Sequence, residues 1–260
     1  MKHLLFALAS TVFSFSLTQA QTSIKIMSYN IHHCNPPSKP DFIDIDAVAN
    51  AIKKENPDIV ALQEVDVNTG RSGKVNEAAQ LALKTGMKSF YFAKAIDHDG
   101  GDYGVAILSK YPLTETETHH LPMDTTTGGE PRVLATASVQ LPGGKVITIG
   151  STHLDAQKAH TNRLLQIKAI NSITREKKQP MIIAGDFNAE ENTEVIKTLD
   201  QQFKRTCGSC KPTIPVIKPK KAIDFIAYKP QNAFKVTKHE VINETYASDH
   251  LPVTSILEIN

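Results

Sequence analysis

Short apolar runs recur along this chain, and several of them adjoin side chains suited to acid–base chemistry. Ile182-Ile183-Ala184 is typical of a buried strand, and it leads directly into Gly185-Asp186-Phe187-Asn188. Val253 to Leu257 is a second such run, and Asp249-His250 stands just before it. Because buried strands are rigid, polar residues at their ends are held in fixed positions. This pattern predicts an enzyme built on β-sheets.

Strand and helix patterns alternate along the rest of the chain. Several consecutive strand patterns are separated only by short turns such as Leu141-Pro-Gly-Gly144, which join antiparallel neighbours. We therefore predict an α+β fold with largely antiparallel or mixed sheets and helices outside them. The expected helices are 43–55, 76–85, 161–175 and 194–199, and the expected strands are 23–30, 59–62, 103–109, 132–141, 146–152, 182–184, 223–228 and 253–257.

The first residues have the form of an export signal. Lys2 is followed by the apolar run Leu4 to Leu17 and by the small residues of Thr18-Gln19-Ala20. A bilayer takes about 20 apolar residues to span, so this run is too short. We predict cleavage after Ala20 and an exported protein, periplasmic or secreted, with an uncleaved N-terminal anchor as the alternative. Residues 21–260 contain no linker-like run, which predicts a single domain.

The charge balance argues against a strong nucleic-acid binder. The chain has 29 Lys and Arg residues against 27 Asp and Glu, whereas such binders carry clustered excess basic charge. No later segment is long and apolar enough for membrane insertion, and we expect a monomer.

Three cysteines are present, and two of them are close together. In an exported protein, Cys207 and Cys210 are expected to close a small disulfide loop, which leaves Cys34 unpaired. A zinc knuckle would need a second ligand pair at comparable spacing, and the sequence has none.

A carboxylate lies in the apolar stretch from Ile223 to Tyr228. Such a carboxylate is costly to bury unless it is paired, so Asp224 needs a partner. An aspartate that binds one imidazole nitrogen fixes the tautomer and stabilises the imidazolium. We predict that His250 is this partner and acts as general base for a water molecule, with Lys221 as the alternative partner.

Glu64 and Asp249 are hard oxygen ligands of the kind that Mg²⁺ prefers, and Mn²⁺ is a possible substitute. We expect Glu64 at the end of the strand that begins at Ile59. The adjacent histidines His32-His33 and His119-His120 repeat no zinc-ligand spacing, so we interpret them as loop residues. The sequence therefore favours a magnesium site made of oxygen ligands.

Other polar residues suit contact with a phosphate group. Asn30, Asn188 and His153 can donate hydrogen bonds to a pentacovalent phosphate, which lowers the barrier to its formation. Arg71 and Arg132 follow glycine-containing segments and are candidates for direct phosphate contact.

Seven motifs occur in the order seen in the endonuclease/exonuclease/phosphatase superfamily, and the chain resembles that superfamily over nearly its whole length after the signal. The superfamily includes deoxyribonuclease I, apurinic endonucleases, inositol polyphosphate 5-phosphatases and neutral sphingomyelinases. Its fold is a four-layer α-β-β-α sandwich with two mainly antiparallel sheets packed face to face. The motifs are Met-Ser-Tyr-Asn30-Ile-His, Ile-Val-Ala-Leu-Gln-Glu64-Val-Asp, Tyr-Gly-Val-Ala-Ile-Leu-Ser109, Ser-Thr-His153-Leu-Asp, Ala-Gly-Asp186-Phe-Asn188-Ala, Ile-Asp224-Phe-Ile and Ser-Asp249-His250-Leu-Pro-Val.

The resemblance implies roles for the metal and acid–base residues. Glu64 would bind the divalent metal with help from Asn30 and Asp249. Asp224 and His250 would form the acid–imidazole pair. The roles of Glu64, Asp249 and the Asp224–His250 pair agree with those inferred from the residues alone.

The resemblance also implies roles around the scissile phosphate. Asp186 would orient or deprotonate the attacking water, and family members are described with either this aspartate or the paired histidine as the base. Asn188 and His153 would contact the phosphate. The apurinic enzymes carry an aspartate where this chain has His32, so a second carboxylate at the metal site is not implied here.

These observations predict an exported, metal-dependent hydrolase of phosphate esters that uses in-line attack by water. A phosphodiesterase is favoured, acting on nucleic acid, a phospholipid head group or a sugar phosphate. The alternatives are a phosphomonoesterase of the inositol-phosphate type and a non-catalytic relative that binds a partner.

Overall fold

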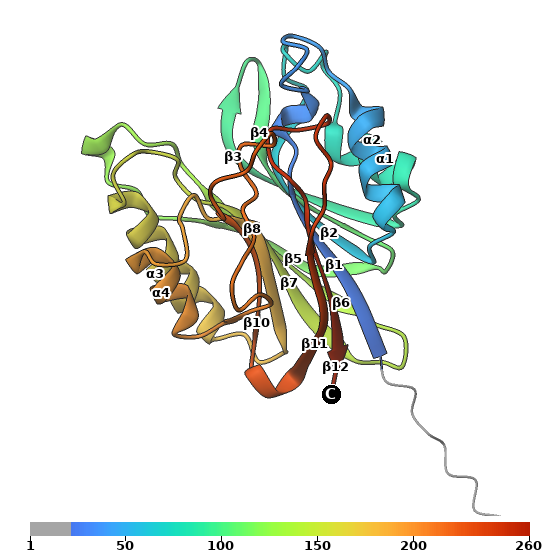
Figure 1. Cartoon of the computed structure of the whole chain (residues 1–260), viewed down its shortest axis with the longest axis vertical. Coiled ribbons are helices and arrows are strands. Elements are labelled where there is room, and N and C mark those ends of the chain that lie inside the picture. Colours follow the sequence, from blue (N-terminus) through green and yellow to red (C-terminus); the bar gives the residue numbers. More distant parts are fainter. Residues whose placement is uncertain (1–21) are drawn as a thin grey trace, which may run out of the picture.

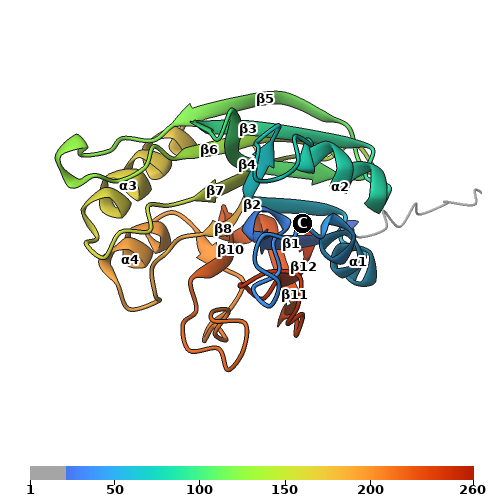
Figure 2. The ribbon, with the colours of Figure 1, turned by 90° about the horizontal axis from the view of Figure 1, so that it is seen from above.

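Two six-stranded sheets pack face to face in the computed structural model, which describes residues 22–260 (Figures 1 and 2). One sheet has the order β11-β12-β1-β2-β4-β3 and the other has the order β5-β6-β7-β8-β10-β9. The pairs β1–β2 and β7–β8 are parallel, and the other neighbours are antiparallel. The strands are β1 (Thr22–Asn30), β2 (Ile59–Val67), β3 (Ser89–His98), β4 (Gly101–Ser109), β5 (Leu113–His120), β6 (Val133–Gln140), β7 (Val146–His153), β8 (Met181–Asp186), β9 (Lys204–Arg205), β10 (Asp224–Lys229), β11 (Phe234–Val241) and β12 (Val253–Ile259).

Two pairs of helices cover the outer faces of the sheets, and Figures 1 and 2 show the pairs on opposite sides of the molecule. The first pair is α1 (Ile45–Glu55) with α2 (Glu77–Thr85), and the second is α3 (Thr161–Arg175) with α4 (Glu194–Asp200). Helix α2 begins after Asn76, whose side chain accepts a hydrogen bond from Ala79 N at 2.9 Å. It ends at Gly86, which has a φ of 72°. The expected four-layer sandwich is confirmed.

Alternation along the strands divides the apolar residues among three cores. In β1, Ile24 and Ile26 face the core between the sheets, while Met27 and Tyr29 belong to the cluster under α1 and α2. The other sheet repeats the pattern, because β8 places alternate residues in the shared core and in the cluster under α3 and α4. Each fully buried side chain of this size stabilises the fold by about 2 kcal/mol.

All four expected helices and all eight expected strands are present, but four further strands were not predicted. They are β3, β5, β9 and β11, and each is an edge strand of its sheet. Strand β5 reads Leu-Thr-Glu-Thr-Glu-Thr-His-His, and all of its residues are partly or fully exposed. An edge strand covers little of the core, so its sequence carries only a weak apolar pattern.

The predicted signal peptide and its cleavage point at Ala20 lie outside the described residues. None of the helices between residues 22 and 260 is long and apolar enough to cross a lipid bilayer.

Candidate active site

Polar side chains from both sheets meet at one end of the space between them. Asn30, His153 and Asp186 are the last residues of β1, β7 and β8, as the sequence predicts. Each continues the alternate series that fills the core between the sheets, so each points inward. Asp186 pairs in register with His153 on one side and with Asp224 on the other. The strand register therefore brings these three side chains together.

Asp224 lies at the first residue of β10 rather than inside the strand, which corrects the expected start of this strand at Ile223. The antiparallel pairing with β8 explains the shift, since the ladder ends where Asp224 meets Asp186. The residue is 4% exposed, so its carboxylate is effectively removed from water.

The expected pair between Asp224 and His250 is present. His250 Nδ1 lies 2.9 Å from Asp224 Oδ2, and Lys221 is not the partner. Thr213 Oγ1 donates a second hydrogen bond to the same oxygen at 2.5 Å. Burial lowers the pKa of His250, but the charges of Asp224 and Asp186 outweigh burial and raise it to about 10. His250 is therefore an imidazolium at neutral pH.

Sequence reasoning missed Thr213. It lies in an irregular segment, and its carbonyl oxygen accepts a hydrogen bond from Leu251 N at 2.9 Å. Nothing in the local sequence marks it, because its importance comes from a contact with Asp224 that forms only in the folded chain.

Asp186 is the most connected side chain of the site. Its Oδ1 accepts a hydrogen bond from Asn188 N at 2.8 Å, and its Oδ2 accepts one from Asn30 Nδ2 at 3.1 Å. The same Oδ2 lies 3.5 Å from His153 Nε2 and 3.7 Å from His250 Nε2. Burial and the charge of Asp224 raise the pKa of Asp186 to about 7. A carboxyl group in this range can accept and release a proton at neutral pH.

His153 lies between an arginine and an amide. Arg132 Nη1 is 3.3 Å from its Nδ1, and Asn188 Nδ2 is 2.9 Å from its Nε2. Burial, together with the positive charges of Arg132 and His250, holds the pKa of His153 well below its usual value. His153 is thus neutral, and the buried Arg132 places a guanidinium beside it that is also paired, through Nη2, with Glu130 Oε2 at 3.0 Å.

Arg71 is engaged away from these groups. Its Nε and Nη2 donate to the two oxygens of Asp66 at 2.7 and 2.8 Å, and its guanidinium lies 5.6 Å from the centre of the Tyr103 ring. The predicted phosphate contact by Arg71 stays a prediction.

Glu64 does not end its strand, which corrects the sequence-based expectation. Strand β2 continues to Val67, and its register with β4 shifts between Leu62 and Val65. This bulge places Glu64 at a φ of 56° and re-aims its side chain. Glu64 Oε1 accepts a hydrogen bond from Asn30 Nδ2 at 3.0 Å, so the bulge brings the carboxylate to the site.

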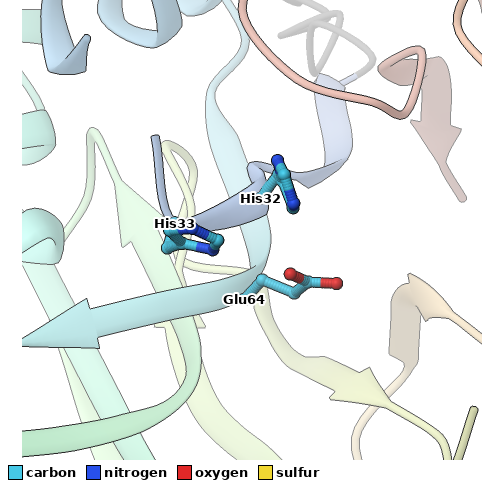
Figure 3. Close-up of side chains that lie close together, drawn as sticks. All are labelled: His32, His33 and Glu64. Carbon is cyan, nitrogen blue, oxygen red and sulfur yellow. The ribbon is translucent and has the colours of Figure 1, made fainter. Parts of the chain in front are cut away.

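Two histidines stand beside Glu64. His32 and His33 lie in the 3₁₀ turn His32–Cys34 directly after β1, so they are turn residues as expected. However, one ligand-type atom from each histidine and one from Glu64 lie within 4.8 Å of one another (Figure 3). The spacing of these residues in the sequence does not predict the cluster, because a turn and a bulge bring the three side chains together.

Asp249 lies at the edge of the site. The hydroxyl of the preceding Ser248 donates to the carbonyl oxygen of Asn30 at 2.7 Å, and Asp249 itself is half-buried. Among residues 22–260, the groups of three side chains that could hold a metal do not include Asp249. Its role as a metal ligand stays a prediction.

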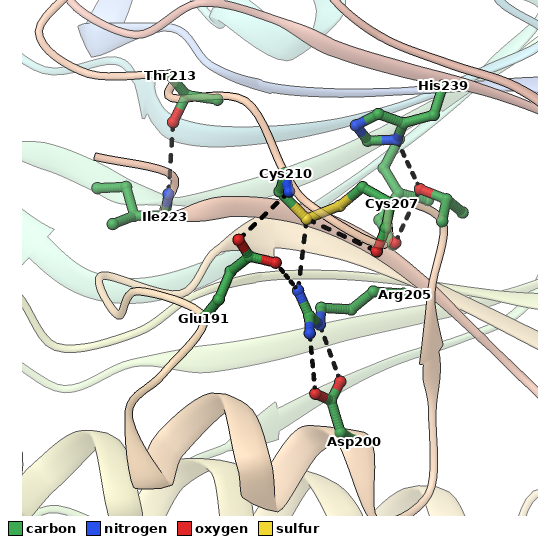
Figure 4. Close-up of a disulfide and its surroundings, with 10 residues drawn as sticks. Glu191, Asp200, Arg205, Cys207, Cys210, Thr213, Ile223 and His239 are labelled. Carbon is green, nitrogen blue, oxygen red and sulfur yellow. Dashed lines mark hydrogen bonds and ion pairs between the residues drawn. A yellow bond between two sulfur atoms is a disulfide. The ribbon is translucent and has the colours of Figure 1, made fainter. Parts of the chain in front are cut away.

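The expected disulfide joins Cys207 and Cys210, and the remaining cysteine, Cys34, is free and buried. Arg205 anchors the disulfide loop through ion pairs with Glu191 and Asp200 (Figure 4). The disulfide and the ion pairs of Arg205 therefore hold the start of the segment that leads to Thr213.

The fold and the site together define a class of protein. A four-layer sandwich with carboxylates and imidazoles gathered at one end of the facing sheets is the architecture of deoxyribonuclease I-like proteins. Residues 27–250 match the profile of the Endonuclease/Exonuclease/phosphatase family. The chain belongs to this family, whose members are phosphoester hydrolases.

Individual relatives agree with this assignment. The chain is 28% identical over 253 residues to the uncharacterized protein YbhP of Escherichia coli K12, covering 92% of this chain and 98% of YbhP. It is 29% identical over 187 residues to the inositol phosphosphingolipids phospholipase C of Schizosaccharomyces pombe, covering 64% of this chain and 41% of that enzyme. The solved catalytic domain of human nocturnin with bound sulfate has a similar fold, with a TM-score of 0.72, 21% identity, and coverage of 92% of this chain and 94% of that domain.

Proposed function

We propose that this protein is an exported, divalent-metal-dependent phosphodiesterase. The observation that carries the proposal is the register around Asp186, which puts His153 and Asp224 beside it while Asp224 holds His250 at 2.9 Å. A phosphoester hydrolase needs a base for water and positive groups around the phosphate, and this cluster provides both.

Asp186 is the proposed base. Its Oδ2 is the point toward which Asn30, His153 and His250 converge, so a water molecule bound there would be close to the scissile phosphate. His250 is already protonated and therefore suits a second task, which is to hold the phosphate and stabilise the charge that develops on it. Asp224 keeps the His250 ring in the orientation that this task requires.

The donor set near Glu64 fits a divalent ion. The carboxylate lies on the same hydrogen-bonded chain as Asp186, because Asn30 Nδ2 donates to both. We propose Glu64 as the main ligand, assisted by Asn30 and Asp249, with Mg²⁺ as the ion and Mn²⁺ as its substitute. When bound there, a divalent ion would supply Lewis-acid polarisation of a phosphoryl oxygen and would offset charge on the leaving oxygen.

A relative supports a diester substrate, and a cavity beside the site supports an anionic one. The relative from S. pombe is named as a phospholipase C, an enzyme class that cleaves phosphodiesters. A cavity of about 280 Å³ adjoins Asn188 and is lined by the exposed Lys158 and Lys221 and by Arg163. Positive charge beside the phosphate site attracts anionic substrates such as nucleic acid, phospholipid head groups or sugar phosphates.

We further propose that the protein is exported and acts as a monomer. A disulfide such as Cys207–Cys210 persists in oxidising compartments, which supports a periplasmic or secreted location. The alternatives are an inositol-phosphate type of phosphomonoesterase and a binding protein without activity. The buried carboxylate–imidazole pair argues against the second alternative, since a binding protein has no need of it.

A hydrolysis panel tests the proposal. Plasmid DNA, RNA, sphingomyelin, an inositol phosphate and a generic phosphodiester would be incubated with the protein in Mg²⁺, in Mn²⁺ and in chelator. We expect metal-dependent cleavage of a diester that His250→Ala loses and that the exposed-histidine control His120→Ala keeps. Cleavage of the monoester alone would move the function to the first alternative. Binding of metal without hydrolysis of any substrate would contradict an enzymatic role.

A further inference from the structure

We infer that His32, His33 and Glu64 form a mixed nitrogen and oxygen site for a transition-metal ion, with higher affinity for Zn²⁺ than for Mg²⁺. The inference rests on the proposed function in one respect, because Glu64 is also the proposed ligand of the catalytic ion. It goes further by giving this chain two imidazole ligands that neither the sequence pattern nor the family resemblance predicts.

The backbone brings the three side chains together from neighbouring strands. The turn His32–Cys34 follows β1 directly, and Glu64 stands in the bulge of the adjacent parallel strand β2. A hydrogen bond from Ile31 N to Gln63 O, at 3.1 Å, ties the two segments together just before the ligands. Figure 3 shows the resulting group, whose ligand-type atoms lie within 4.8 Å of one another. Zinc–nitrogen and zinc–oxygen bonds are about 2 Å long, so side chains this close need only small rotations to bind one ion together.

The hydrogen bonds of His32 prepare it as a ligand. Its Nδ1 lies 2.8 Å from the carbonyl oxygen of Asn35, which can only accept. In the neutral ring the proton is therefore on Nδ1, which leaves the Nε2 lone pair free to bind a metal. Histidines that bind metals commonly hold their other ring nitrogen in this way, which fixes the tautomer and the ring orientation.

His33 supplies an independent observation. Its Nδ1 is buried and has no hydrogen-bond partner in the described part of the chain. A buried polar nitrogen without a partner is costly, so its position points to a ligand that it would bind. The His33 ring stacks at a tilt against His32, with centroids 4.6 Å apart, so both rings are held in the same small region.

The backbone of the cluster is strained. His32, His33 and Glu64 have φ values of 46°, 41° and 56°, and Cys34 continues the series with 55°. A left-handed conformation at a non-glycine residue costs roughly 1–2 kcal/mol. Strain of this kind persists where it positions side chains for a function, and here it positions all three candidate ligands.

The ligand types set the choice of metal. Mg²⁺ is bound by oxygen ligands and retains most of its waters, whereas imidazole nitrogen suits Zn²⁺, Fe²⁺, Ni²⁺ and Cu²⁺. Two histidines with one carboxylate are three protein ligands, which leave room for a water molecule or a phosphate oxygen. Because Asn30 joins Glu64 to Asp186, an ion held here would lie beside the proposed base.

X-ray absorption on the unaltered protein is the first test. The purified protein would be stripped of metal with a chelator and given one equivalent of Zn²⁺, and scattering from the outer atoms of imidazole rings would be measured at the zinc edge. We expect two histidine ligands and an oxygen ligand. A spectrum without two imidazoles would overturn the inference, and this measurement does not depend on any variant folding.

Calorimetric titration with Zn²⁺ and with Mg²⁺ is the second test. We expect His32→Ala and His33→Ala each to weaken Zn²⁺ binding by at least about tenfold. The matched controls are His119→Ala and His120→Ala, which alter the other adjacent histidine pair and should change Zn²⁺ affinity by less than about twofold. Equal Zn²⁺ affinity in all four variants, with folding checked by circular dichroism, would overturn the site.

Hydrolysis measured on the same preparations separates this inference from the proposed function. If no metal supports hydrolysis but Zn²⁺ binding depends on His32 and His33, the metal site stands and the proposed function fails. If the protein hydrolyses a substrate but Zn²⁺ binding does not depend on His32 or His33, the proposed function stands and the inferred metal site is wrong.

Discussion

The two groups of ligand-type side chains in this protein are built in different ways. Asp186, Asp224 and His250 form a buried group, called the dry group below, in which Asp186 ends strand β8, Asp224 begins strand β10 and His250 is held by Asp224. His32, His33 and Glu64 form a half-buried group made from a strained turn and a bulge. The first group is suited to proton chemistry and the second to metal binding. Asn30 connects them, since its amide donates to both Glu64 and Asp186.

The largest expected effect comes from removing the imidazole of the dry group. His250→Ala should lower turnover by roughly 10³-fold at saturating metal, because the developing charge on the phosphate loses its imidazolium partner. The measurement is kcat across a metal titration, with the thermal unfolding midpoint as a control for folding. If added metal restores turnover, the two groups do not have separate tasks.

The dry group is also the part of the site that the sequence predicts well. Asn30, His153 and Asp186 stand at the ends of apolar runs, and alternation along the strands predicts that they face the same way as the core residues before them. The central strands were found for the same reason, since they are apolar on both faces or alternate regularly. The edge strands were missed because nearly all of their residues are partly or fully exposed.

The metal-ligand group could not be predicted in the same way. A bulge moves Glu64 out of the strand alternation, and three consecutive left-handed residues place His32 and His33 where no periodic pattern would. Thr213 was missed for a related reason, because it contacts Asp224 from an irregular segment. Contacts that depend on irregular backbone do not leave a periodic signal in the sequence.

The next largest expected effect is on folding stability, and it concerns Glu77, which binds the backbone close to Glu64. Glu77 accepts a hydrogen bond from Asp66 N at 2.8 Å, two residues after Glu64, and burial together with the charge of Asp66 raises its pKa to about 8. The folded protein therefore keeps a proton on Glu77 that the unfolded chain releases above its ordinary pKa of 4.5. Stability from this proton is complete below about pH 4.5 and is lost as pH rises to about 8.

Glu77→Gln should remove this pH dependence. The variant should gain on the order of 4 kcal/mol relative to the unaltered protein between pH 4.5 and pH 8, since glutamine carries no charge to bury. Denaturant unfolding at several pH values measures the difference. If the difference in unfolding free energy between the two proteins is constant across this pH range, Glu77 is not held protonated.

Glu64→Gln should separate metal binding from proton chemistry. We expect the metal concentration that gives half-maximal activity to rise about 10- to 100-fold, because the amide replaces a charged ligand with a neutral one. The decrease in kcat at saturating metal should be smaller than in His250→Ala. If the folded variant needs no more metal than the unaltered protein, Glu64 is not a metal ligand. The contrast between a proton-transfer group and a metal-binding group would then be wrong.

The smallest expected effect concerns how the dry group is positioned. Thr213 reaches Asp224 Oδ2 through its hydroxyl and binds Leu251 N through its carbonyl oxygen, so it connects the aspartate to the segment that carries His250. Thr213→Val keeps the shape and removes only the hydroxyl, and kcat should fall about 5- to 10-fold with KM nearly unchanged. Thr213→Ser should restore kcat, because it keeps the donor. If the valine and serine variants behave alike, the hydroxyl does not position Asp224, and the register of the strands together with His250 is sufficient to hold this group.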